Sequence, residues 1–191
     1  RVLRGVAQYM IGHYVEAAED LEHPSLKKNV EIYPWRAGIA SARGDWAGAY
    51  RLMEDIDPIF LGYPTKIAVK FGLLAAEAAM AVDDYRVGTA RMDALGKFAM
   101  TKNDLDYVAF LRGHILKRKD KNDAALALWY NVVETGNRPS RAKASFAVIS
   151  ALLDLGRIDE AEAIDRFGAL RFAWRDDVFE FDLYQRLAQL D

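Results

Sequence analysis

A short pattern recurs five times along the chain and constrains its fold more than any other feature. Each copy has Gly or Asp at a turn, usually a bulky residue two positions later, and a small residue five positions later. The turn residues are Gly12, Gly44, Asp83, Asp120 and Gly156, and the small residues are Ala17, Ala49, Gly88, Ala125 and Ala161. A pattern that recurs along the chain at intervals of 20 to 50 residues is typical of a structural repeat.

A large apolar residue follows the small residue by four positions in most copies. It is present in the first four copies as Leu21, Met53, Met92 and Trp129. In the fifth copy Asp165 stands at this position, and we expect Ile164 to replace it. Residues four apart lie on the same face of a helix, so the small and large residues together mark one buried face.

The pattern predicts pairs of antiparallel helices. Gly and Asp tolerate the left-handed conformation that ends a helix, and the bulky residue packs as the next helix begins. The small residue lets the two helix axes approach closely. Because one pair cannot cover its own apolar faces, successive pairs are expected to stack and share a continuous core.

The rest of the chain agrees with an all-α fold. Apolar residues recur at helical spacing, and sustained strand-like alternation with hairpin turns is absent from the sequence. Helix N-caps are expected at Thr101 or Asn103, Asn122, Ser140 and Asp159. The five predicted helix pairs occupy residues 2–22, 33–57, 65–98, 103–135 and 140–170, and a further helix begins near Asp177.

We therefore expect one helical repeat domain over residues 1–191. The last helix has the apolar spacing of a first helix without its partner, which favours a fragment of a longer array over a chain that ends in a capping helix. The predicted repeats span residues 1–30, 31–63, 64–101, 102–138 and 139–175, followed by a partial repeat over 176–191.

These residues resemble the tetratricopeptide-repeat (TPR) family, from about Arg4 to the end of the chain. The closest matches are Gly44-Asp45-Trp46 with Ala49, Gly12 with Tyr14 and Ala17, and Gly5 on the first helix. The copies are degenerate: their spacing mostly exceeds the usual ~34 residues, and Gly88 stands where Ala is usual. Sel1-like repeats stay an alternative. The resemblance implies a right-handed α–α superhelix, a TPR-like solenoid of about five helix pairs plus a terminal helix.

The sequence favours a binding protein over an enzyme. His13, His23 and His114 are too far apart for a helical metal site, and the paired carboxylates lie at turns or helix ends. No phosphate-binding loop, nucleophile elbow or HExxH motif is present in the sequence. We expect no catalytic residue, no metal site and no cofactor.

The amino-acid composition excludes several further classes of protein. Hydrophobic residues make up 52% of the chain and the net charge is −2, which together exclude a disordered chain and a strongly basic protein that binds polyanions. The chain has no cysteine, so disulfides and thiol chemistry are excluded; this composition favours the bacterial periplasm over the cytoplasm. No apolar run approaches the ~20 residues that a membrane span needs.

Charge is unevenly distributed. Residues 112–143 contain eight basic and three acidic side chains, whereas residues 154–191 contain five basic and ten acidic ones. Adjacent blocks of opposite sign are typical either of the solvated outer face of ordinary helices or of a polarised surface for a partner or a second copy of the chain. We therefore expect a protein or peptide partner, with self-association as a further expectation and no nucleic acid.

The TPR resemblance places the binding surface on the concave face, which the first helices of successive pairs form. The candidate partner-binding residues are Glu31, Ser41, Lys70, Glu77, Tyr107, Phe110, His114, Lys117, Lys143 and Ser150, with Met80 and Phe146 beside them. For Phe110 and Phe146 we favour a place in the core. The lysine and asparagine set with which some TPR domains clamp a terminal carboxylate has no counterpart, since Leu73, Glu77 and Ala81 stand there.

The predicted function is a non-catalytic scaffold that holds a partner segment in this groove. The segment Leu170-Arg171-Phe172-Ala173-Trp174 resembles alphaproteobacterial repeat proteins associated with flagella, so the bacterial envelope or flagellar motor is the expected setting. Two alternatives stay open: the helical superstructure of a cell-wall lytic enzyme, and a solenoid that binds nucleic acid.

Overall fold

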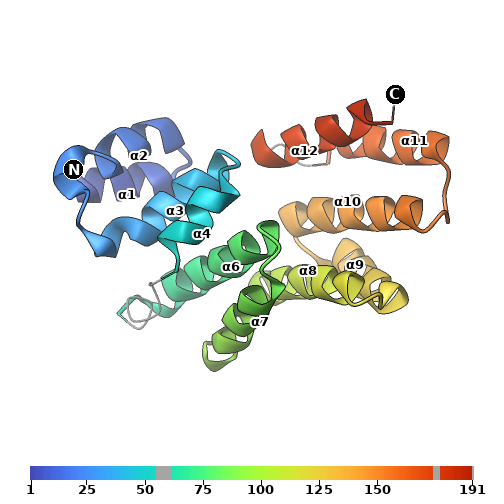
Figure 1. Cartoon of the computed structure of the whole chain (residues 1–191), viewed down its shortest axis with the longest axis horizontal. Helices are drawn as coiled ribbons and strands as arrows, with labels where there is room; N and C mark the ends of the chain where they lie inside the picture. Colours follow the sequence, from blue (N-terminus) through green and yellow to red (C-terminus); the bar gives the residue numbers. More distant parts are fainter. Residues whose placement is uncertain (55–61, 174–176, 191) are drawn as a thin grey trace. The chain divides into compact units, whose positions relative to one another are not determined.

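The chain is described by a computed structural model over residues 1–54, 62–173 and 177–190. In these ranges it is helical, with no β-strand (Figure 1). The predicted all-α class is confirmed. The α-helices are α1 (Val2–Met10), α2 (Tyr14–Leu21), α3 (Tyr33–Ala42), α4 (Trp46–Leu52), α6 (Thr65–Ala81), α7 (Tyr85–Ala94), α8 (Lys102–Arg118), α9 (Asn122–Thr135), α10 (Arg138–Asp154), α11 (Glu160–Leu170) and α12 (Asp177–Ala188), and the short 3₁₀ helices are η1 (Pro24–Leu26), η2 (Val30–Ile32) and η3 (Leu95–Lys97).

The five predicted turn residues all adopt the left-handed conformation. Their φ angles are 84° at Gly12, 77° at Gly44, 63° at Asp83, 56° at Asp120 and 63° at Gly156. At each turn, the amide of the following residue donates to the carbonyl five positions earlier, with N···O distances of 2.9 to 3.0 Å. This bond satisfies a carbonyl at the end of the first helix and reverses the chain into the second.

In most copies the N-cap of the second helix directly follows the turn residue and the helix begins one residue later, and an aspartate caps several of these helices. The side chains of Asp45 and Asp84 accept hydrogen bonds from the amides of Gly48 and Val87 at 2.8 and 3.0 Å. Among the N-caps expected from sequence, Thr101 and Asp159 are confirmed. Asn122 and Ser140 lie inside their helices instead, because Lys121 and Asn137 occupy the cap positions.

The small and large residues of the first four copies lie in the core, as predicted. Ala17, Ala49, Gly88 and Ala125 are buried, and so are Leu21, Met53, Met92 and Trp129. The small residue falls four positions after the N-cap and the large residue eight positions after it. Both therefore face the first helix of the pair.

The assignment of the fifth copy was wrong, by two positions for the small residue and by three for the large one. Ala161 is exposed and Ile164 only half-buried, whereas Ala163 and Phe167 are fully buried. The cause is an extended connection: Asp159, three residues after Gly156, caps α11, and in the other copies the cap follows the turn directly. Counted from the cap, Ala163 and Phe167 occupy the same places as the small and large residues elsewhere.

Two glycines on first helices make room for the large residues. A Cβ atom at Gly5 would lie 2.6 Å from Cγ of Leu21, and a Cβ atom at Gly113 would lie 2.1 Å from Nε1 of Trp129. Each glycine lies seven residues before its turn residue, at the place where the paired helices cross. The Trp129 indole N–H donates to the Phe110 carbonyl at 2.9 Å, which fixes α9 on α8.

The chain divides into two compact units, residues 1–99 and 100–191. In the first unit α1 packs on α2, α3 on α4 and α6 on α7, and neighbouring pairs meet through α2 with α3 and α4 with α6. The first helices also contact one another, α1 with α3 and α3 with α6. Consecutive packing of helix pairs, as the repeat predicts, is therefore present in this unit.

The second unit contains two helix pairs and the terminal helix. Here α8 packs on α9, α9 on α10, α10 on α11 and α11 on α12, and the first helices α8 and α10 also touch. Phe179 and Leu183 of α12 are buried, and the Phe179 ring lies 6.1 Å from that of Phe146 on α10. The helix predicted to begin near Asp177 therefore covers the last pair. Residues 55–57 of the second predicted pair, and Trp174 of the segment beginning at Leu170, lie outside the described residues.

Candidate functional site

In the first unit, the first helices are joined by a row of aromatic side chains. Tyr9 of α1, Trp35 of α3 and Phe71 of α6 are buried and meet edge to face, with ring centroids 5.6 Å apart for Tyr9 and Trp35 and 4.8 Å apart for Trp35 and Phe71. Aromatic pairs in this geometry stabilise a core beyond the area they bury. The row connects the first helices of this unit into one layer.

Lys70 lies at the edge of this layer. Its ammonium nitrogen is 4.5 Å from the centroid of the Tyr9 ring, a cation–π contact between α6 and α1. Partial burial, with Lys66 as a second cause, lowers the pKa of the Lys70 ammonium. Burial also raises the pKa of the Tyr9 hydroxyl, with a smaller effect of Tyr14. Lys70 is exposed, so its positive charge is available to an anionic partner beside the Tyr9 ring.

The second unit has a similar combination on α8 and α10. The Lys143 ammonium donates to the Tyr107 hydroxyl at 2.8 Å and lies 5.0 Å from the centroid of that ring. The Tyr107 ring lies beside Phe110, which stands edge-on to His114, and His114 contacts Trp129. Four of the residues predicted for the binding face, Tyr107, Phe110, His114 and Lys143, therefore lie together. Phe110 is buried, in agreement with the favoured core assignment.

Lys117 and Asp154 link the first helices of the second unit. The Lys117 ammonium lies 2.5 Å from one carboxylate oxygen of Asp154, and the other oxygen is 3.2 Å from the Arg186 guanidinium of α12. The ion pairs connect α8, α10 and α12. The Lys117–Asp154 pair also joins the basic segment 112–143 to the acidic segment 154–191. Part of the uneven charge seen in the sequence is therefore neutralised by ion pairs within the chain.

The other predicted residues are dispersed. Glu31 is exposed on η2, where its backbone carbonyl accepts from the Tyr63 hydroxyl at 2.8 Å. The Ser41 hydroxyl donates to the Gly38 carbonyl at 2.9 Å. Glu77 is half-buried on α6, and the buried Ser150 hydroxyl has no hydrogen-bond partner within the described residues. Met80 is buried in α6, and Phe146 is half-buried against Phe167 and Phe179.

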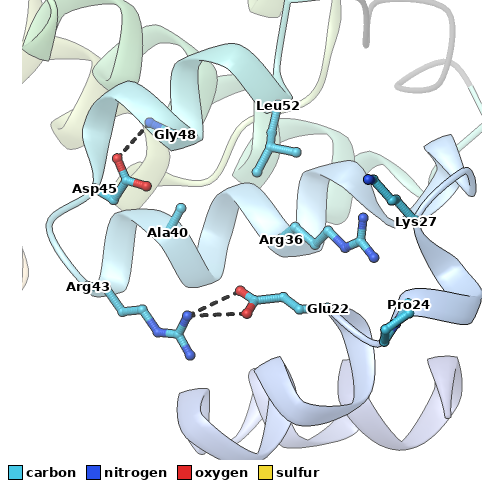
Figure 2. Close-up of a pocket in the computed structure, with 9 residues that line it drawn as sticks. All are labelled: Glu22, Pro24, Lys27, Arg36, Ala40, Arg43, Asp45, Gly48 and Leu52. Carbon is cyan, nitrogen blue, oxygen red and sulfur yellow. Dashed lines mark hydrogen bonds and ion pairs between the residues drawn. The ribbon is translucent and has the colours of Figure 1, made fainter.

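A pocket of about 510 Å³ opens between the end of α2, η1, α3 and α4 (Figure 2). Its lining combines apolar and charged side chains. The lining residues are Glu22, Pro24, Lys27, Arg36, Ala40, Arg43, Asp45, Gly48 and Leu52. The volume lies within the range of small-molecule sites in proteins.

The carboxylates of the pocket are engaged by the protein itself. Glu22 receives the Arg43 guanidinium at 3.1 and 3.5 Å, and Asp45 caps α4 through the Gly48 amide (Figure 2). Arg36 donates from Nε to the Leu21 carbonyl at 2.7 Å, which orients its guanidinium. In the ranges that the structure describes, neither Lys27 nor Arg36 forms an ion pair with a carboxylate.

None of the ten residues predicted for the binding face lines this pocket. The sequence indicates one part of the pocket lining. Arg36, Ala40 and Arg43 follow the i, i+4, i+7 spacing of a single helix face. Their neighbours Glu22, Lys27 and Leu52 come from other elements, and no local pattern indicates that these elements converge.

No protein-family model, curated protein or solved structure matches this chain. The resemblance to tetratricopeptide repeats therefore stays a prediction. Two further findings concern the described ranges alone. No cluster of three or more His, Asp or Glu side chains there is placed to hold a metal ion, and no helix there has both the length and the apolar character needed to cross a bilayer.

Proposed function

We propose that the chain is a right-handed, TPR-like repeat scaffold that binds a segment of a partner protein along the face formed by its first helices. The proposal is supported by the five left-handed turns, each with the same capping hydrogen bond, and by the contacts between successive first helices within each unit. A stack of helix pairs presents such a face as an extended surface.

The observation that carries the proposal is the pairing, in each unit, of a tyrosine on one first helix with a lysine on another. Lys70 lies over Tyr9 in the first unit, and Lys143 lies over Tyr107 in the second. Tyrosine supplies a large contact area with a polar tip and few rotatable bonds, and it is enriched where proteins bind one another. A lysine held over a ring is already partly ordered, so less conformational entropy is lost when a partner binds.

The chemistry of this face favours a segment that carries acidic and apolar side chains. The acidic groups would approach Lys70 or Lys143, and the apolar groups would contact the half-buried Tyr107 ring. Binding would need no catalytic residue, which agrees with the expectation of a non-enzymatic protein.

A peptide selection with the whole chain tests the proposal. Peptides selected from a random displayed library would be synthesised, and their affinities measured by fluorescence anisotropy against wild type, Lys143→Glu and Lys70→Glu. Lys28→Glu is the matched control, because Lys28 is exposed, lies outside the first helices and undergoes the same change of charge. We expect at least one face variant to weaken binding by about tenfold or more and the control to leave it unchanged. Equal loss in all three variants, or no selected peptide, would contradict the proposal.

A further inference from the structure

We infer that the pocket between α2, η1, α3 and α4 binds a small organic carboxylate, whose anionic group lies between Lys27 and Arg36. The site is separate from the face proposed above, because its lining includes neither the aromatic row nor the tyrosine–lysine pairs. The inference does not depend on that proposed function.

The charged groups of the pocket favour an anion, because their positive charges exceed their negative charges by one. Glu22 and Arg43 neutralise each other, which leaves Lys27 and Arg36 opposite a single further carboxylate, Asp45. Asp45 is already bonded to the Gly48 amide. In Figure 2 the ends of the Lys27 and Arg36 side chains lie on the same side of the pocket. A ligand with one negative charge would balance the remaining positive charge there.

Arg36 is prepared for such a ligand. Its Nε atom is occupied by the Leu21 carbonyl at 2.7 Å, so the guanidinium plane is fixed and the terminal nitrogens are its remaining donors. A guanidinium of fixed orientation binds a planar carboxylate with little loss of side-chain entropy. Lys27 is positioned by η1, since its amide donates to the Pro24 carbonyl at 3.2 Å.

Two features favour a carboxylate with an apolar body over inorganic phosphate. The charged side chains of the lining sum to one positive charge, which a single carboxylate balances and a dianion would exceed. The rest of the wall is formed by Pro24, Ala40 and Leu52, which offer apolar contact and no hydrogen-bond donor from their side chains. A ligand that is apolar at one end and anionic at the other matches both parts of the lining.

Titration of the ¹⁵N-labelled chain with hexanoate tests the inference, with acetate, hexanamide and inorganic phosphate as comparison probes. We expect saturable shifts of the Ala40, Gly48 and Leu52 amides with hexanoate, at a Kd in the millimolar range. Acetate lacks the apolar body and hexanamide lacks the charge, so both should bind at least about fivefold more weakly.

Lys27→Gln and Lys28→Gln form a matched pair of variants. Both side chains are exposed and adjacent in sequence, but only Lys27 lines the pocket. Lys27→Gln should weaken hexanoate binding by about fivefold or more and Lys28→Gln by less than about twofold. Arg36→Gln should abolish it; if that variant fails to fold, the two lysine variants decide the question.

Several results would overturn the inference. Hexanamide binding as tightly as hexanoate would show that the site does not require an anion. Phosphate binding more tightly than hexanoate would show that the ligand class is wrong. Equal effects of the two lysine variants, or shifts that do not saturate, would show that the pocket is not the site.

Discussion

Replacement of Gly113 by alanine should destabilise the second unit, although alanine is the better helix former. Gly113 lies within α8, and its missing Cβ leaves the space that Trp129 fills. An added Cβ would lie 2.1 Å from Nε1, 2.5 Å from Cε2 and 2.7 Å from Cδ1 of that ring. Trp129 is fully buried and bonded to the Phe110 carbonyl, so it cannot move away freely.

Two opposing effects decide the magnitude. Replacing an interior helical glycine by alanine gains about 1 kcal/mol in helix propensity. Overpacking a rigid core costs about 1–3 kcal/mol, and displacement of the indole would also weaken its hydrogen bond, which is worth about 1 kcal/mol. The cost exceeds the gain, and we expect a net loss of about 1–3 kcal/mol in the free energy of unfolding.

Gly168→Ala is the matched control, because Gly168 lies in α11 of the same unit and a Cβ there would meet no atom within 4 Å. It should stabilise the protein by about 0.5–1 kcal/mol. Urea unfolding followed by circular dichroism and by tryptophan fluorescence would measure both variants. If Gly113→Ala were as stable as Gly168→Ala, the proposed packing of Trp129 on α8 would be refuted.

Three further predictions concern the turns and the helix crossings. Ala163→Leu should destabilise by about 1–3 kcal/mol through overpacking, whereas Ala161→Leu should change stability by less than about 0.5 kcal/mol; the reverse order in urea unfolding would restore the assignment made from sequence. Asp120→Gly should stabilise by up to about 1 kcal/mol, because Asp120 has a left-handed φ of 56° that glycine adopts without strain; a lower melting temperature would argue against that conformation. A hydrogen bond from the Arg4 guanidinium is the main cause that lowers the pKa of Asp20. The Asp20 carboxylate should therefore stabilise the fold above pH ~4, and this stabilisation should be lost as the pH falls further. The melting temperatures of wild type and Asp20→Asn should converge in acid, and a difference that does not change with pH would contradict this linkage.

Much of the fold was predictable because its strongest signals are local. A left-handed turn needs Gly or a residue such as Asp83 or Asp120, and a close helix crossing needs a small residue at a set distance from the cap. Both requirements can be read from a few consecutive residues. The fifth copy was misassigned because Arg157 and Ile158 extend the connection before Asp159, and counting from the turn then gives the wrong face.

The sites were harder to predict because they depend on contacts between distant residues. Tyr107 and Lys143 were both identified as candidates, but the hydrogen bond between them joins residues on two different helices. The pocket combines Glu22 at the end of α2, Arg36 of α3 and Leu52 of α4, and only the spacing along α3 has a sequence signal. In the tyrosine–lysine pair of the first unit, Lys70 was predicted as a binding residue, whereas Tyr9 was not.

Backbone chemical shifts of the full chain, measured by triple-resonance NMR, test the central structural claim most directly. The account predicts helical ¹³C shifts on both sides of Gly12, Gly44, Asp83, Asp120 and Gly156, with the shifts of a left-handed residue at each of these positions. Helical shifts that continue without a break through these residues, or extended-strand shifts in the segments between them, would contradict the repeat of paired helices on which both proposed sites depend.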